Sequence, residues 1–201
     1  TWTYVKDNGG GSTDCTNSNC LDAAFIDDIV FPPVYVESDA MLGDANGDMI
    51  LNILDVIAVV NMVLGNAEAD LVTSDLNGDG IVSVLDIIQL LNIILGDTGR
   101  LSDANSAVMD ILSDGVSISA DGYIGAVQMT LSHDSGFELS LTDNAFVSEY
   151  KTDKTATTLI VVMPESNQIF TTSDNFKVDE ILVTNSESFI DVTQSVAEFS
   201  L

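Results

Sequence analysis

The chain has 201 residues, of which 46% are hydrophobic, and its 32 Asp and Glu against five Lys and Arg give a net charge of −27. The hydrophobic content excludes a disordered acidic tail. The charge argues against nucleic acid or membrane surfaces as partners, since both need clustered Lys and Arg. It suits a cation-binding protein or one that stays soluble at high ionic strength, and the length allows one large domain or two or three small ones.

Residues 1–37 predict a β segment. Trp2 and Tyr4 alternate with polar residues, and the strand "AAFIDDIVFPP" ends at Pro32-Pro33. Two strands cannot bury a core, so they must pair with the rest of the chain, another copy or missing sequence. The stretches "WTYVKD" and "CLDAAFIDDIVFPP" resemble the last strands of a jelly-roll accessory domain of secreted bacterial hydrolases and peptidases. We interpret the chain as a mature or excised part of a longer protein.

The two cysteines, Cys15 and Cys20, are spaced to close a small loop disulfide, although two free thiols remain the alternative. A disulfide predicts a secreted or cell-surface protein. The longest apolar runs, 53–64 and 84–95, are interrupted by Asp and Asn and are shorter than the ~20 residues that span a bilayer. We therefore expect no membrane insertion.

Residues 38–100 are predicted to be one unit, in which a linker over 38–42 precedes an internal duplication over 43–98. "GDANGDMILNILDVIAVVNMVLGN" aligns without a gap to "SDLNGDGIVSVLDIIQLLNIILGD", which begins 31 residues later. Each copy predicts a polar loop, then a helix, then Gly65 or Gly96 as the helix stop. This part of the chain is therefore predicted to be a two-helix unit.

Oxygen-bearing side chains recur on alternate residues of both loops, as a twelve-residue calcium loop requires. Ca²⁺ takes about six to eight oxygen ligands, and loop positions 1, 3, 5, 9 and 12 supply side chains while position 7 supplies its carbonyl. Two acidic turns are the alternative interpretation, and Mg²⁺ suits this flexible ligand set less well. The predicted ligands of two Ca²⁺ ions are Asp44, Asn46, Asp48, the Ile50 carbonyl, Asn52 and Asp55, and then Asp75, Asn77, Asp79, the Ile81 carbonyl, Ser83 and Asp86.

Loop position 6 differs between the copies. This position usually needs Gly for the bend of the loop, and Gly80 supplies it in the second copy, whereas Met49 stands there in the first. We therefore predict that the first loop is strained and binds Ca²⁺ less tightly than the second.

The paired units resemble a type I dockerin rather than a true EF-hand, because "FPPVYVESDAMLG" before the first loop is no helix and position 12 is Asp in both loops. The resemblance implies two antiparallel helices, organised by calcium, whose outer face binds a cohesin. The sequence departs from the family at loop positions 10 and 11, where dockerins often carry hydroxyl residues. Apolar residues at these partner-binding positions are Ile53, Leu54, Val84 and Leu85.

Both predicted helices, "ILDVIAVVNMVLG" and "VLDIIQLLNIILG", are apolar nearly all round. Packing the two helices against each other covers only one side of each. Each Ile, Leu or Val side chain left exposed loses the ~1.5–3 kcal/mol of stabilisation that its burial would give. The cover could be the chain's own C-terminal domain, another copy, or a separate cohesin-like partner.

Residues 101–201 predict a β-sandwich of about eight or nine strands, because short alternating stretches are separated by turn signals such as "ADG" and "HDSG". The stretch "GYIGAVQMTLSHDSGFELSL" weakly resembles the early strands of cohesin-type domains. The predicted fold is thus mixed and mainly β: a β segment, a dockerin-like calcium unit, and an Ig- or cohesin-like sandwich.

No catalytic motif is found. His133, the only histidine, lies in "LSHDSG" and is predicted to be a solvated turn residue, and no G-x-S-x-G, H-E-x-x-H or Walker motif occurs. We predict an extracellular, calcium-binding, non-catalytic assembly or attachment module. The alternatives are the accessory C-terminal region of a secreted hydrolase or peptidase, and a subunit of an extracellular filament joined by strand or helix exchange.

Overall fold

The computed structural model describes residues 40–96 and 102–195. The chain divides into two units, Thr1–Glu37 and Ser38–Leu201, and everything described here belongs to the second. The predicted N-terminal β segment, with Cys15 and Cys20, lies outside the described residues.

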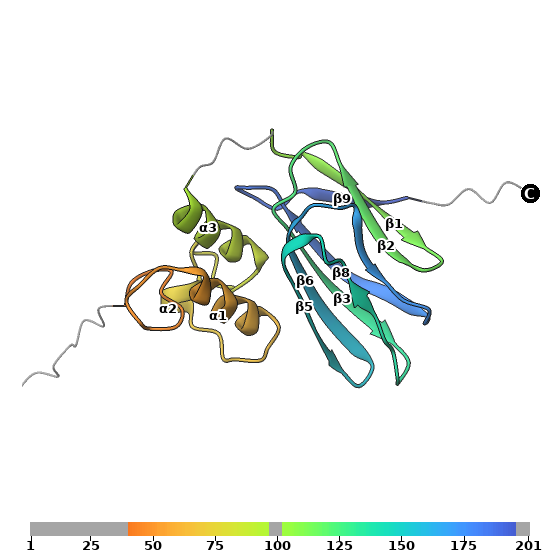
Figure 1. Cartoon of the computed structure of the whole chain (residues 1–201), viewed down its shortest axis with the longest axis horizontal. Coiled ribbons are helices and arrows are strands. Elements are labelled where there is room, and N and C mark those ends of the chain that lie inside the picture. Colours follow the sequence, from red (N-terminus) through yellow and green to blue (C-terminus); the bar gives the residue numbers. More distant parts are fainter. Residues whose placement is uncertain (1–39, 97–101, 196–201) are drawn as a thin grey trace, which may run out of the picture. The chain divides into compact units, whose positions relative to one another are not determined.

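Residues 102–195 form two sheets, which confirms the predicted β-sandwich (Figure 1). The five-stranded sheet has the order β4-β7-β2-β1-β9 and the four-stranded sheet the order β5-β6-β3-β8. All pairs are antiparallel except β1 with β9. The strands are β1 (Ser106–Leu112), β2 (Gly115–Ala120), β3 (Ala126–His133), β4 (Ser140–Leu141), β5 (Ala145–Asp153), β6 (Ala156–Pro164), β7 (Gln168–Thr171), β8 (Phe176–Thr184) and β9 (Asp191–Gln194).

A first hydrophobic core fills the space between the two sheets. Because side chains alternate along a strand, one face of each strand supplies this core. Val127, Met129 and Leu131 of β3 contribute from the four-stranded sheet, and Ile118 and Phe170 contribute from the five-stranded sheet. All five side chains are fully buried.

Residues 40–96 form the helical unit, with α1 (Ile53–Val63), α2 (Leu71–Ser74) and α3 (Val84–Leu95). The predicted helices thus occur at the predicted positions. α1 begins with a capping box, in which the Asn52 side chain accepts a backbone N–H of the first turn and the Asp55 carboxylate accepts the Asn52 N–H. Ser83 and Asp86 form the same box at the start of α3.

A second hydrophobic core joins the helical unit to the outer face of the four-stranded sheet. Ala126, Ile160 and Val162, which alternate with the sandwich-core residues, pack with α1 and α3 side chains such as Val60 and Ile88. The four-stranded sheet is therefore a middle layer, with helices on one face and the second sheet on the other (Figure 1). The sequence left open whether the apolar helix faces pack on the chain's own C-terminal domain, on another copy or on a separate partner. In the structure they contact the chain's own sandwich.

Few polar contacts join the helices to the sandwich. The Lys151 Nζ of β5 donates to the Gly65 carbonyl at 2.6 Å, just after the end of α1. This is the end of a helix dipole that favours a cation. The Asn92 side chain of α3 donates to the Ser186 carbonyl at 2.9 Å. The attachment of the helical unit is consequently mainly apolar.

His133 differs from its sequence prediction, because it is a buried strand residue and not a solvated turn residue. The residue is 9% exposed at the end of β3, and its ring stacks on Phe137 with 4.2 Å between ring centroids. The Nε2 atom lies 2.8 Å from Thr157 Oγ1. Pairing of β3 with β6 brings Thr157 beside the ring, and this long-range contact has no local sequence signal.

No helix within residues 40–96 and 102–195 has the length and apolar character needed to cross a membrane.

Candidate metal-binding loops

The first residue of the first loop organises the backbone around its own carboxylate. Asp44 Oδ1 accepts the backbone N–H groups of Gly47 at 2.9 Å and Asp48 at 3.0 Å. Its Oδ2 accepts the Met49 N–H at 2.9 Å. Three consecutive amides therefore point at one side chain, and the loop curls around Asp44.

The second loop repeats this arrangement at the corresponding residues. Asp75 Oδ1 accepts the backbone N–H groups of Gly78 at 2.8 Å and Asp79 at 3.1 Å, and its Oδ2 accepts the Gly80 N–H at 2.9 Å. The duplication seen in the sequence is thus also a duplication of the hydrogen-bond network.

Position 12 closes each loop from the first turn of the following helix. In the first loop, Asp55 is fully buried and accepts the N–H groups of Asn46 at 3.2 Å and Asn52 at 2.9 Å through separate oxygens. A carboxylate oxygen has about two acceptor sites, so each Asp55 oxygen retains one.

Asp86 closes the second loop in the same way. It accepts the N–H groups of Leu76 at 2.9 Å, Asn77 at 3.2 Å and Ser83 at 2.8 Å. Burial raises the pKa of Asp86, while these three backbone donors oppose the rise and the charge of Asp75 adds to it. A nearby cation would favour the ionised form of such a buried carboxyl group.

The remaining predicted ligands of the first loop hydrogen-bond to one another. Asn46 Nδ2 donates to Asp48 Oδ2 at 3.1 Å, and Asn52 Nδ2 donates to the Ile50 carbonyl at 3.0 Å. In the second loop, Asn77 donates to Asp79 at 2.8 Å. In the first loop, the carbonyl of Ile50 at position 7 and the side chain of Asn52 at position 9 are therefore already in contact without an ion.

Both loops make their bend at position 6 with a left-handed backbone. Gly80 has φ +88° and Met49 has φ +64°. A residue with a Cβ pays roughly 1–2 kcal/mol in this region. The expected strain of the first loop is therefore located at Met49.

The chemistry of the loops fits a hard cation, since carboxylate, amide and carbonyl oxygens are the ligands that Ca²⁺ takes. Within residues 40–96 and 102–195, however, no three His, Cys, Asp or Glu side chains lie in a group that could hold a metal ion. The loop carboxylates are instead directed to backbone amides. Ion binding would require them to share their remaining lone pairs with the ion.

The four predicted partner-binding residues fall into two environments. Val84 is fully buried in the core between the helices and the sheet, and Leu85 is only 6% exposed. Ile53 is 40% exposed and Leu54 is 54% exposed. Only the two residues of the first copy are accessible to another molecule.

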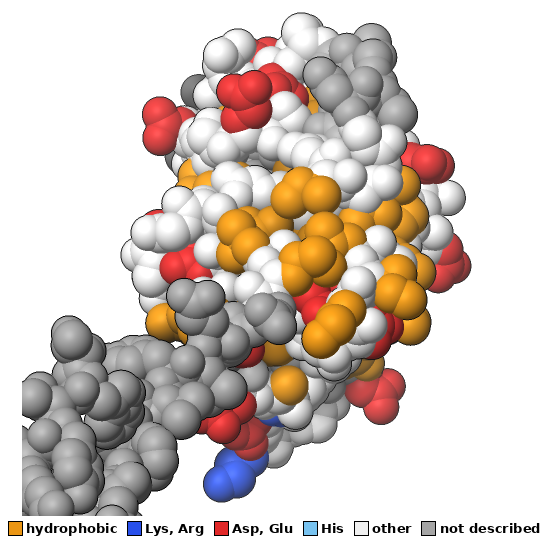
Figure 2. Space-filling model, turned by 90° about the vertical axis from the view of Figure 1, so that its left-hand side faces the viewer, with side chains coloured by type: hydrophobic (Ala, Val, Ile, Leu, Met, Phe, Trp, Pro, Cys, Tyr) orange, Lys and Arg blue, Asp and Glu red, His pale blue; other side chains and the backbone are white. Residues whose placement is uncertain are grey.

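Further apolar side chains are exposed on the helical unit. Figure 2 views the molecule from this side and shows hydrophobic side chains gathered near the middle of the face, with acidic side chains around them. The exposed large hydrophobic residues of the helical unit include Met41, Leu42, Met49, Ile50, Ile57, Leu71, Val72 and Ile81.

One structural feature of the loops had no prediction from the sequence. The short helix α2 is capped by Asp70, and its Thr73 carbonyl accepts the Gly43 N–H at 2.7 Å, immediately before the first loop. Gly43 has φ +96°, and a Cβ there would lie 3.0 Å from the Leu90 side chain of α3. The Gly-Asp pair at 43–44 could have predicted the bend, but no sequence pattern could have predicted the contact with α2.

Neither the protein-family models nor the curated proteins compared with this sequence gave a match. Among solved structures, the chain is similar to a non-cellulosomal cohesin from the hyperthermophilic archaeon Archaeoglobus fulgidus. The TM-score is 0.29 and the sequence identity 8%, over 47% of this chain and 84% of that chain.

Proposed function

We propose that this chain is a non-catalytic, extracellular protein-assembly module whose duplicated loops, like dockerin repeats, bind two Ca²⁺ ions. The observation that carries the proposal is the repeated network in which Asp44 and Asp75 each accept three backbone N–H groups. Two loops of the same construction, each rich in oxygen ligands and each closed by a buried Asp, favour the same ligand in both.

Calcium would act on the helices through the capping residues. Asp55 and Asp86 belong both to the predicted ligand sets and to the capping boxes of α1 and α3. An ion held by them would offset two of the three carboxylate charges of each loop and fix the starts of both helices. Calcium binding should therefore stabilise the helical unit.

The assembly role is supported by the apolar surface beside the loops. Ile53 and Leu54, at positions 10 and 11 of the first loop, are exposed, as are Met49 and Ile50 at positions 6 and 7. Exposed contiguous apolar side chains with a polar rim are typical of protein interaction sites. Calcium would set the geometry in which the module presents this surface to a protein partner.

Calcium titration of the metal-free full chain by isothermal calorimetry tests the proposal, together with thermal melts with and without calcium. We expect two ions per chain and a higher melting temperature with calcium. Asp48→Ala and Asp79→Ala should each remove one ion from the stoichiometry. Asp134→Ala, which changes an acidic residue outside the loops, is the matched control and should keep both.

The proposal fails if the wild-type chain gives no binding heat and the same melting temperature at millimolar calcium. It also fails if Asp134→Ala lowers the stoichiometry as much as the loop variants do.

A further inference from the structure

Among the described strands, β5 lies at an edge of the four-stranded sheet, where a further strand could pair. In the strand order, β5 and β8 are the two edges, and each has nine residues. β8 carries Lys177, Asp179 and Glu180, and charged residues are a common protection of sheet edges. β5 also carries charged residues, Glu149, Lys151 and Asp153, but it exposes two large aromatic side chains, Phe146 and Tyr150, which are 46% and 44% exposed.

The ladder register identifies which β5 residues turn their backbone groups to this edge. The Thr155 carbonyl accepts the His133 N–H of β3, so the odd-numbered residues of β6 face β3 and the even-numbered ones face β5. Val162 pairs with Val147, so the odd-numbered residues of β5 bond to β6. The N–H and C=O groups of Ser148, Tyr150 and Thr152 therefore point to the open edge.

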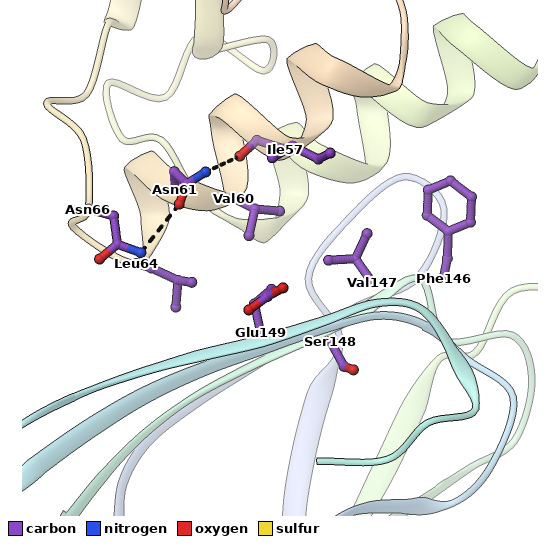
Figure 3. Close-up of a pocket in the computed structure, with 9 residues that line it drawn as sticks. All are labelled: Ile57, Val60, Asn61, Leu64, Asn66, Phe146, Val147, Ser148 and Glu149. Atoms are coloured by element: carbon purple, nitrogen blue, oxygen red, sulfur yellow. Dashed lines mark hydrogen bonds between the residues drawn. The ribbon is translucent and has the colours of Figure 1, made fainter. Parts of the chain in front are cut away.

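A groove of about 400 Å³ lies between α1 and β5 beside this edge. Figure 3 shows Val60 of α1 and Leu64, which directly follows α1, above the strand. Val147 and Glu149 are directed from the strand toward α1, whereas Ser148 points away. An added strand next to β5 would place alternate side chains on the α1 side of the sheet. Apolar side chains at those positions could enter the groove.

Glu149 gives the groove a charge preference. Its carboxylate is exposed and has no hydrogen-bond or ion-pair partner in the described parts of the chain. The nearby Lys151 is engaged by the Gly65 carbonyl. A Lys or Arg of an added strand would stand opposite Glu149. The net charge of −27 likewise favours a positively charged partner.

We propose that the β5 edge and the groove beneath α1 form a binding site for an extended strand of another polypeptide, with apolar side chains entering the groove and a Lys or Arg facing Glu149. Backbone pairing supplies affinity and the groove supplies side-chain selection. This site goes beyond the calcium-loop surface, and its test does not depend on how many ions the loops bind.

The test measures binding of a dye-labelled, end-blocked peptide, TVTKTVT, to the full chain by fluorescence polarisation in calcium buffer at physiological ionic strength. One face of this peptide in a strand carries Val, Lys and Val. We expect saturable binding that Ser148→Pro weakens by about tenfold or more, since proline removes an edge N–H and blocks pairing. The Ser148 N–H has no partner in β6, so the melting temperature of this variant should stay unchanged.

Matched probes separate strand pairing from attraction of any cation. The same peptide with N-methyl groups on alternate amides keeps its charge but cannot pair, and should bind about tenfold more weakly or not at all. Glu149→Gln should weaken binding of TVTKTVT about threefold or more and strengthen binding of the Lys-to-Glu peptide, because it removes an attraction in the first case and a like-charge repulsion in the second.

The proposal is overturned if TVTKTVT does not bind at millimolar concentration. It is also overturned if folded Ser148→Pro binds the peptide as the wild type does, or if the N-methylated peptide binds equally well. A Ser148→Pro chain that melts early would be replaced by Tyr150→Pro, for which the same expectation holds. If both proline variants melt early, the open edge was wrongly identified.

Discussion

Met49 has a backbone conformation that favours glycine, and its side chain makes few contacts that could offset the strain. Its φ of +64° favours glycine, while its side chain is 71% exposed and contributes little packing. In the second loop, Gly80 takes the same bend with φ +88°, and a Cβ at Gly80 would meet no atom within 4 Å. The two positions therefore differ in backbone strain and hardly at all in packing.

We expect Met49→Gly to strengthen calcium binding by the first loop about threefold to tenfold, because it removes roughly 1 kcal/mol of left-handed strain. Calorimetric titration in an Asp79→Ala background, which leaves only the first loop, measures the change. The reciprocal Gly80→Met, in an Asp48→Ala background, should weaken the second loop by a similar factor. An unchanged or weaker first site in Met49→Gly would contradict the assignment of strain to Met49.

Asp121 links the stability of the sandwich to pH. Backbone N–H groups of Ser106 and Asn105 donate to its carboxylate at 3.1 and 2.8 Å and lower the pKa of Asp121 below the ordinary value of 3.8. Because the folded pKa is depressed, this contribution is fully present above pH 3.8. It is lost as the pH falls through the lower folded value.

Asp121→Asn, which keeps an acceptor oxygen but has no charge to lose, should therefore melt below the wild type near neutrality. The difference in melting temperature should shrink as the pH falls below about 3.8. Melts over a pH series at constant salt measure it. A difference that stays constant across the series would exclude this linkage.

Helices α1 and α3 have matching sequences in different environments. Ile57 and Ile88 occupy the same position in the two copies, yet Ile57 is 46% exposed and Ile88 is 1% exposed. The difference arises because α3 lies against the sheet, where a Cβ on Gly125 would be 3.1 Å from Ile88 Cγ1. Sequence patterns predict which helices form, but two similar helices cannot reveal which of them is covered.

This pair of positions provides a matched experiment. We expect Ile88→Ala to lower the free energy of unfolding by about 2–4 kcal/mol, because it opens a cavity between helix and sheet. Ile57→Ala should cost less than about 1 kcal/mol. Denaturant unfolding at fixed calcium measures both, and equal losses would argue against the docking of α3 on the sandwich.

Other elements were predicted to different extents for physical reasons. The starts of α1 and α3 depend on residues close together in the sequence, because Asn52 and Ser83 cap helices whose third residue is an acidic partner. Both starts were therefore predictable. The four-residue α2 and the strand β7 were missed. α2 is held by the contact of its Thr73 carbonyl with Gly43, and β7 by pairing with β2 and β4, which are far away in the sequence.

The loop ligand set follows from residue spacing alone, and the structure adds what spacing cannot give. The directions of the carboxylates depend on the backbone amides around them, as at Asp44 and Asp75. The groove at β5 is likewise invisible in the sequence, because its two walls, α1 and β5, meet only through the second core.

The charge of the whole molecule is strongly one-sided. With 32 acidic and five basic residues, most carboxylates have no cationic partner, and in the described residues the single ion pair joins Lys177 to Asp179 at 2.6 Å. Mutual repulsion of such charges destabilises a compact state, and added salt screens it.

We therefore expect the metal-free chain to melt several degrees higher at ~1 M than at ~0.01 M NaCl, as the Debye length falls from about 30 to about 3 Å. Choline chloride at the same ionic strength is the control and should give the same shift, because screening does not depend on the identity of the monovalent cation. A flat or falling melting temperature would show that repulsion is not a main cost of folding.

The parallel pairing of β1 with β9 joins the first strand of the sandwich to its last, with Ser106 beside Asp191. The five-stranded sheet is therefore incomplete until the ribosome has finished almost the whole domain. Contacts this distant in the chain form slowly, because a long loop must close before they are made. During synthesis the nascent sandwich would carry β1 with one edge unpaired, so a chaperone has a defined strand to protect.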